Sequence, residues 1–190
     1  MNTSFSRAML LLIATLAFAG CETAPKTPEA KQALASDARA SLDRMYSTDP
    51  GVRNLVNQAY GYAIFPSVGK GGFIAGGAYG RGEVYEQGNL IGYADLSQGT
   101  VGLQAGGQEY SELILFETPD ALNRFRSGNF AFSANASAVA LKAGASGAAR
   151  FENGILVFTQ PKGGLMFEAS IGGQKFSFEP IGQPSTQPTR

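Results

Sequence analysis

The spacing of hydrophobic residues changes from a helical period to an alternating one near residue 62. Within residues 29–46, apolar side chains recur three or four positions apart, at Leu34, Ala38, Leu42 and Met45. This stripe predicts a helix, either packed on the domain or lying on a membrane surface. Because the stripe is weak and the charges of the segment balance, packing on the domain is favoured. Residues 48–60 follow, with a proline near their start, a wider apolar face and a glycine after them, which predicts a second helix.

Alternating apolar and polar positions predict strands along most of the remaining chain. The expected strands cover residues 63–65, 71–79, 82–85, 90–95, 101–108, 112–116, 155–159, 165–170 and 175–179. Pro66 is expected to stop the first of them, and turns are expected at Gly80-Arg81 and at residues 87–89. A helix at residues 118–128 interrupts the strands, while segment 130–143, rich in small residues, fits neither pattern.

Glycine is over-represented, and its positions shape the expected fold. The chain has 25 glycines in 190 residues, and many of them fall inside or between the predicted strands. Glycine at such positions permits bends, bulges and the close approach of a second backbone. We therefore predict an α+β domain, with N-terminal helices packed on a strongly curved, mainly antiparallel, Gly-rich sheet or partial barrel that has one inserted helix.

The ionisable side chains exclude several classes of function. Basic and acidic residues balance at 15 each, so no global attraction for nucleic acid is expected. The chain has no histidine, the commonest general base and metal ligand, and we expect neither a metal nor a cofactor. Glu109 and Glu112 remain as candidates for carboxylate catalysis, but their odd spacing in a strand pattern points them to opposite faces. A non-enzymatic protein is therefore expected.

The first 21 residues have the layout of an export signal. Arg7 precedes an apolar run at residues 8–19, which is too short to span a bilayer, and small residues then lead to Cys21, the sole cysteine. Residues 18–21 (FAGC) resemble the lipobox of bacterial lipoproteins, although Phe18 stands where Leu is preferred. The alternative is a secreted protein with an incidental cysteine. We predict a signal peptide at 1–20, a lipidated tether at 21–28, a domain at 29–182 and a disordered tail at 183–190.

Acylation of Cys21 would fix the location of the protein. Each buried methylene contributes about 0.8 kcal/mol, so several acyl chains on one residue would hold the protein on a membrane. Glu22 follows the cysteine, whereas an Asp there, by resemblance to enterobacterial lipoproteins, favours the inner membrane. We therefore expect a lipid-anchored protein of the bacterial cell envelope, at the outer membrane and facing the periplasm.

A glycine-rich segment at residues 69–82 (GKGGFIAGGAYGRG) superficially matches phosphate-binding loops. A nucleotide-binding loop requires Gly-Lys followed by Ser or Thr and then by a helix. Here Lys70 is followed by Gly71 and a strand pattern, so we interpret the segment as a glycine-rich hairpin.

The same region resembles a known family. Residues 64–73 (IFPSVGKGGF) are similar to the signature of the SYLF domain family. Further matches follow in the order of the family, at residues 77–82 (GAYGRG), 102–106 (GLQAG), 135–137 (NAS) and 164–166 (GLM). The resemblance spans roughly residues 29–180 and implies a lipid-binding module. Eukaryotic members bind phosphoinositides beside SH3 domains in actin-associated proteins, whereas bacterial members are commonly envelope lipoproteins. Because this chain has no SH3 segment and carries a predicted export signal, no actin partner is expected.

Recognition of phospholipid headgroups requires cations and free backbone N–H groups. Lys70 lies in the matched signature and is flanked by Gly71 and Gly72. Arg81, at a predicted hairpin tip, and Lys162, at a glycine-flanked turn, are the other candidates. Each of the three is alternatively a solvated turn cation.

Several aromatic residues are candidates for contact with acyl chains, although core packing is the favoured interpretation: Phe73, Tyr79, Tyr85 and Phe130. The competing hypothesis for function is a structural or adaptor lipoprotein that binds another envelope protein through an exposed apolar patch.

Overall fold

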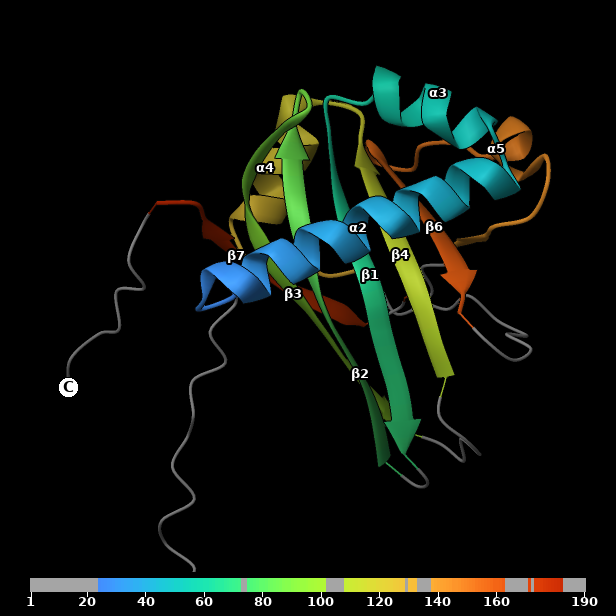
Figure 1. Cartoon of the computed structure of the whole chain (residues 1–190). Coiled ribbons are helices and arrows are strands. Elements are labelled where there is room, and N and C mark those ends of the chain that lie inside the picture. The colour runs from blue at the N-terminus through green and yellow to red at the C-terminus, as the bar shows by residue number, and fades with distance from the viewer. Residues whose placement is uncertain are drawn as a thin grey trace, which may run out of the picture.

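The computed structural model describes residues 24–72, 75–101, 108–128, 130–132, 138–162, 171 and 173–182. The helices, labelled as in Figure 1, are α2 (Pro28–Thr48), α3 (Gly51–Gln58), α4 (Pro119–Arg126) and α5 (Ala145–Ala148). The strands are β1 (Gly61–Gly72), β2 (Ala75–Glu86), β3 (Asn89–Val101), β4 (Gln108–Phe116), β5 (Val139–Ala140), β6 (Ile155–Pro161) and β7 (Gln174–Pro180). No described helix has both the length and the apolar content needed to cross a bilayer.

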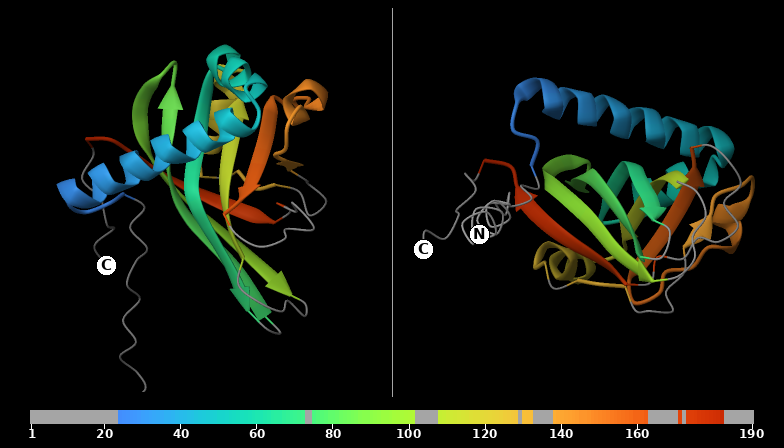
Figure 2. Two further views of the ribbon diagram at one scale, coloured as in Figure 1. Left: turned by 45° about the vertical axis from the view of Figure 1, so that its right-hand side comes forward. Right: turned by 90° about the horizontal axis from the view of Figure 1, so that it is seen from below.

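The strands form one seven-stranded sheet in the order β5-β6-β4-β1-β2-β3-β7. Neighbouring strands are antiparallel except for β5 and β6, which are parallel. Figure 2 shows that the sheet is strongly curved, with α2 on its outside and α4 on the opposite side. The prediction of an α+β domain with a curved, mainly antiparallel sheet is confirmed.

Each face of the sheet has its own hydrophobic core. The outer face packs against α2, α3 and α5, and its core includes Met45, Val56 and Phe158. The inner face packs against α4, and its core is rich in phenylalanine, with Phe65, Phe116, Phe125 and Phe176 among its buried side chains. The first predicted helix therefore packs on the domain, as expected, through its buried residues Ala38, Ser41 and Met45.

The central strand β1 continues through Pro66, so the expected stop at this residue is wrong. The register of β1 shifts between Ile64 and Ser67 against β2, and between Phe65 and Val68 against β4. Such a bulge leaves proline, which has no N–H, outside the ladder on both sides. The carbonyl oxygen of Pro66 instead accepts hydrogen bonds from the hydroxyls of Ser111 (2.8 Å) and Ser41 (3.4 Å).

The turn expected at Gly80-Arg81 is also wrong, because β2 runs uninterrupted through both residues. Gly80 and Gly82 lie where the backbones approach closely, since a Cβ at Gly82 would come within 2.5 Å of the Ile64 carbonyl oxygen. These glycines therefore permit close packing and do not break the strand. The turn expected at residues 87–89 is confirmed, with Gln87 and Gly88 at positive φ.

The inserted helix α4 is confirmed in detail, with Thr118 as its cap and Ala121, Leu122 and Phe125 buried. Segment 130–143, which fitted neither pattern, contains β5 and precedes the short helix α5. The strand expected at 90–95 is longer in the structure, where β3 extends to Val101. Of the strand expected at 101–108, residues 102–107 lie outside the described residues, and β4 begins at Gln108. The predicted leader, the strand expected at 165–170 and the tail lie outside the described residues.

The contact at Gly82 generates a test of the sheet. We expect Gly82→Ala to destabilise the domain by about 1–3 kcal/mol, because the added methyl group would overlap the backbone of β1. Urea unfolding of the variant and the parent chain measures the difference. Gly99→Ala, in β3, is the matched control, because a Cβ there meets nothing within 4 Å. Equal losses of stability in the two variants would contradict the close approach.

Candidate functional site

The predicted headgroup residues Lys70, Gly71 and Gly72 lie at the far end of β1, where this strand pairs with β2. Lys70 pairs with Ala78 of β2 and Gln108 of β4, and the two glycines pair with Gly77 and Gly76. The backbone therefore places all three within the ladder of the β1–β2 hairpin. The side chain of Lys70 lies outside what the structure describes.

Arg81 lies in the middle of β2, so its expected position at a hairpin tip is wrong. Its Nε donates a hydrogen bond to Asp95 Oδ1 (3.0 Å) on β3, and its Nη2 donates to the Tyr79 hydroxyl (3.2 Å). Asp95 is buried, with a side chain 7 % exposed. The positive charge of Arg81 is therefore already balanced by a carboxylate on the neighbouring strand.

Lys162 follows β6 and is likewise paired. Its Nζ donates to Glu109 Oε1 (2.9 Å), and the same oxygen accepts a hydrogen bond from Ser67 Oγ (2.6 Å). The Ser67 hydroxyl and the Lys162 ammonium hold the pKa of Glu109 below its usual range. Because Ser67 is also the register partner of Arg81, the two predicted cations belong to one polar row across the outer face. A phosphate bound there would compete with Glu109 and Asp95.

The aromatic candidates occupy different environments. Phe73 lies outside the described residues, and Tyr79 is 47 % exposed. Tyr85 stacks on Tyr62, with ring centroids 4.7 Å apart, and its hydroxyl donates to Glu83 (2.7 Å). Phe130 packs edge-on against Phe132 at 5.1 Å. Tyr85 therefore packs against the outer core, whereas Phe130 packs at the margin of the inner core and also lines a pocket.

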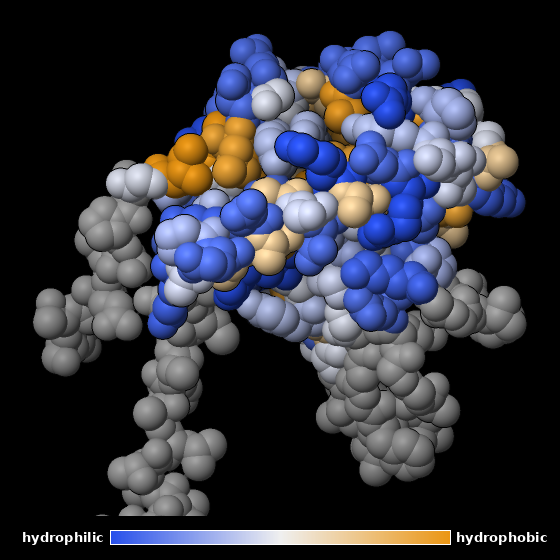
Figure 3. Space-filling view, viewed as in Figure 1, coloured by the Kyte–Doolittle hydropathy of each residue, from blue (hydrophilic) through white to orange (hydrophobic). Residues whose placement is uncertain are grey.

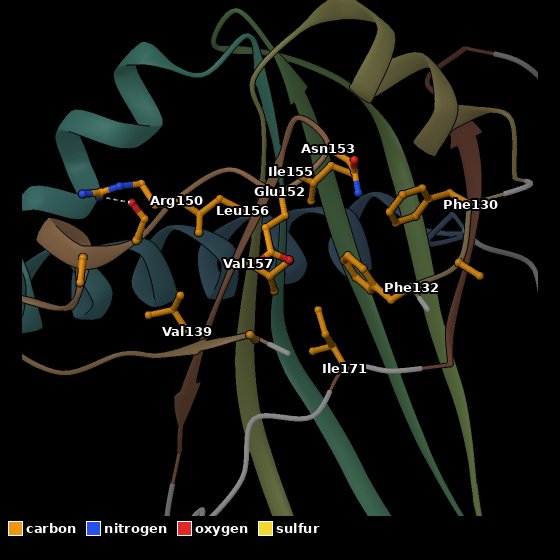
Figure 4. A pocket seen from close by; sticks show the side chains of 14 residues that line it. Phe130, Phe132, Val139, Arg150, Glu152, Asn153, Ile155, Leu156, Val157 and Ile171 are labelled. Atoms are coloured by element: carbon orange, nitrogen blue, oxygen red, sulfur yellow. Dashed lines mark hydrogen bonds between the residues drawn. The ribbon is translucent and has the colours of Figure 1, made fainter. Parts of the chain in front are cut away.

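A pocket of about 610 Å³ opens beside β6, at a place where no sequence pattern indicates one. Figure 4 shows Phe130 and Phe132 on one side of the pocket and Val139 on the other. The 14 residues that line it are Phe130, Ala131, Phe132, Ala138, Val139, Ala148, Ala149, Arg150, Glu152, Asn153, Ile155, Leu156, Val157 and Ile171. Its size falls within the range typical of sites for small molecules.

The pocket exists because the edge strand β5 is short. β5 pairs with β6 at Phe158 and Thr159, while the three preceding residues of β6 line the pocket. Alanine residues form much of the remaining lining, and their small side chains leave the space open. The polar lining residues are Arg150, Glu152 and Asn153, which lie together in the segment that leads into β6.

A long-range contact fixes α5 beside this pocket. The carboxylate of Asp49 accepts hydrogen bonds from the backbone N–H of Ser146 (2.7 Å) and from its hydroxyl (2.9 Å). These bonds, together with one from the Gly51 N–H, lower the pKa of Asp49 despite its burial. The turn between α2 and α3 thereby holds the helix that supplies Ala148 to the pocket wall.

A buried polar cluster lies deeper on the inner face. Glu112 is fully buried, and its Oε2 accepts a hydrogen bond from Gln174 Nε2 (2.9 Å), which also donates to the Tyr110 hydroxyl (3.3 Å). Within the described part of the chain, no partner is present for Glu112 Oε1 or for Thr159 Oγ1, on the neighbouring strand. Burial raises the pKa of Glu112 to about 8.

The two candidate catalytic carboxylates point to opposite faces, as predicted. Glu112 is buried on the inner face with Tyr110, whereas Glu109 is exposed and pairs with Lys162 on the outer face. They cannot act on one substrate from these positions. Among the described residues, no cluster of three or more acidic or cysteine side chains is placed to hold a metal ion.

Comparison with known proteins agrees with the predicted family resemblance. Residues 97–180 match the family model of Ysc84, described as a Las17-binding protein actin regulator, which is the SYLF domain. The chain is also 28 % identical over 154 residues to beta cell expansion factor A of Aeromonas veronii, across 80 % of this chain. The chain spans 59 % of the length of that relative. The resemblance to the SYLF family is therefore confirmed.

The buried carboxyl of Glu112 makes stability depend on pH. Because burial raises its pKa from 4.5 to about 8 in the folded state, the folded chain retains a proton that the unfolded chain releases. The contribution of Glu112 to the free energy of unfolding is fully present below pH 4.5 and is lost as the pH rises through about 8. Between the two pKa values the free energy of unfolding falls by about 1.4 kcal/mol for each pH unit. We expect Glu112→Gln to remove this slope in urea unfolding measured from pH 5 to 8.5.

Glu109→Gln is the control for this measurement. Because the pKa of Glu109 is lowered in the folded state, its contribution to the free energy of unfolding is lost as the pH falls, on the acidic side of the measured range. This variant should keep the parental slope above pH 5. A parental slope that survives Glu112→Gln would show that another group is responsible.

Proposed function

We propose that this chain, which resembles the SYLF family, is a non-enzymatic, membrane-anchored lipid-binding protein of the bacterial cell envelope. The pocket beside β6 is the observation that carries this proposal. It combines an apolar lining from Phe132, Val139 and Val157 with a polar segment at Arg150. An amphiphile with an acyl chain and a polar head is the class of ligand that complements such a surface.

Arg150 is suited to meet the polar part of such a ligand. It is exposed, and its Nη1 donates to the carbonyl oxygens of Ala149 (2.7 Å) and Gly147 (3.1 Å), which hold the guanidinium at the end of α5. A guanidinium group has five N–H donors, so donors remain for a phosphate or carboxylate. The acyl chain would then contact the apolar residues of β6.

Lys70 is the second point of headgroup contact in the proposal. The two other cations selected from the sequence, Arg81 and Lys162, are bonded to Asp95 and Glu109. A headgroup at either one would have to displace a carboxylate, which lowers the net gain. We therefore assign recognition of headgroup phosphates to Lys70, with the backbone of Gly71 and Gly72 beside it.

Acylation of Cys21 after removal of residues 1–20 supplies the anchor in this proposal. The leader and the FAGC sequence support it, and Glu22 favours the outer membrane facing the periplasm. The description of the matched family includes binding of Las17 and regulation of actin. We do not extend these activities to this chain, because the leader would direct it away from any cytoskeleton.

Filling the pocket tests where the lipid binds. Ala138 is half-buried and lines the pocket, so we expect Ala138→Phe to weaken binding of a phospholipid with one fluorescent acyl chain at least tenfold. Ala140→Phe is the matched control, because Ala140 is exposed and outside the pocket lining. Titrations of both variants provide the measurement. Equal affinities of the two variants would place the lipid elsewhere. In a separate experiment, crosslinking in intact cells that captures a protein partner, with no lipid copurifying, would favour the adaptor hypothesis.

Reversing the charge at Lys70 tests the headgroup assignment separately. We expect Lys70→Glu to reduce sedimentation of the protein with phosphatidylglycerol vesicles severalfold, and 0.5 M salt to reduce that of the parent chain, because the contact is electrostatic. Lys142→Glu, at an exposed lysine outside the predicted site, controls for the change in net charge. Binding that is unchanged by Lys70→Glu would remove this residue from the site.

A further inference from the structure

The N-terminal end of the described chain is held against strand β7. The backbone N–H of Ala24 donates a hydrogen bond to Glu179 Oε2 (3.0 Å), across 155 residues of sequence. Glu179 lies on β7, paired with Tyr93 of β3. The chain therefore enters the domain beside the edge strand, close to the point where β7 ends at Pro180.

The same edge carries exposed hydrophobic surface. We define the β7 edge as Ile91, Phe178 and Ile181. Ile181 is 50 % exposed, and its N–H donates to the Ile91 carbonyl oxygen (3.0 Å), while Ile91 and Phe178 are each partly exposed at the margin of the inner core. Figure 3 shows apolar side chains gathered beside the last described residues of the chain.

The distance from this edge to the predicted acylation site is short. Ala24 is three positions after Cys21, and a fully extended chain of that length spans at most about 10 Å. Acyl chains on Cys21 would therefore hold the β7 edge close to the bilayer surface. At such a distance even a weak apolar contact is populated, because tethering makes the local concentration of the membrane high.

The charges around the edge nearly balance. The Arg126 guanidinium lies 5.5 Å from the ring centroid of Phe178 and 3.7 Å from the carboxylate of Glu86. The Lys31 ammonium lies 5.8 Å from the ring centroid of Tyr93, and Tyr93 is the register partner of Glu179. Each cation therefore has an acidic residue near it. Apolar contact therefore dominates over attraction to anionic lipids. Arginine and lysine with apolar stems beside aromatic rings are suited to the boundary between headgroups and acyl chains.

We propose that the β7 edge lies against the bilayer and inserts Ile181 at the membrane interface, which fixes the orientation of the domain on the membrane. This inference rests on the proposed acylation of Cys21. It does not use the pocket beside β6, because the pocket residues Ala131 and Phe132 meet the beginning of β7, at Lys175 and Gln174, whereas the β7 edge lies at the end of this strand.

Tryptophan fluorescence tests this orientation, because the chain has no tryptophan of its own. The full chain with Ile181→Trp is purified from membranes and reconstituted into phosphatidylethanolamine–phosphatidylglycerol vesicles with brominated acyl chains, which quench tryptophan on contact. Lys142→Trp is the control, since Lys142 is exposed and follows β5, which stands at the opposite end of the strand order from β7. We expect at least twofold stronger quenching at position 181, unchanged by 0.5 M salt.

The intact mass of the same preparations separates the two hypotheses. A chain with the mass of acyl groups on Cys21 and equal quenching at the two positions would overturn the docking proposal and leave the anchor intact. A chain without that added mass would overturn both the anchor and the docking that rests on it. Circular dichroism of the two variants verifies that each retains the parental fold.

Discussion

The carbonyl oxygen of Pro66 is buried between the central strand and α2, and the hydroxyls of Ser111 and Ser41 satisfy it. A buried carbonyl without a partner would cost about 1–3 kcal/mol, and proline removes a donor from the ladder as well. Both serines come from elements that pack on β1, so the bulge also attaches α2 to the sheet. The bend of the central strand, which lies between the inner and the outer core, depends on this arrangement.

The sequence predicted those elements whose signals are local. The sequence predicts helix α4 in full, because its signals lie within a few residues of one another. Thr118 caps the helix, Phe125 packs into the core, and Gly128, at positive φ, follows its end. Pro66 and Gly80 were interpreted as breaks because the partners that accommodate them come from other strands. Helix α5 had no local signal, since Asp49, which fixes it, lies 97 residues from Ser146.

In the candidate site, too, local patterns predict some features, whereas contacts between residues distant in sequence determine the others. Alternation along β4 correctly separated Glu109 from Glu112, because the side chains of a strand point to opposite faces by geometry alone. The carboxylates that bind Arg81 and Lys162 depend on register and could not be read from the pattern. The pocket was missed because its lining combines segments from Phe130 to Ile171, and because a short β5 leaves an edge that no periodicity predicts.

The hydrogen bond between Ala24 and Glu179 brings the beginning and the end of the described domain to a single edge of the sheet. A domain connected in this way can be joined to other segments, on either side in sequence, without a linker crossing its surface. The seven register pairs that fasten β7 to β3 would then carry any mechanical load between such segments, and the pocket wall at β6 would stand outside the path of that force.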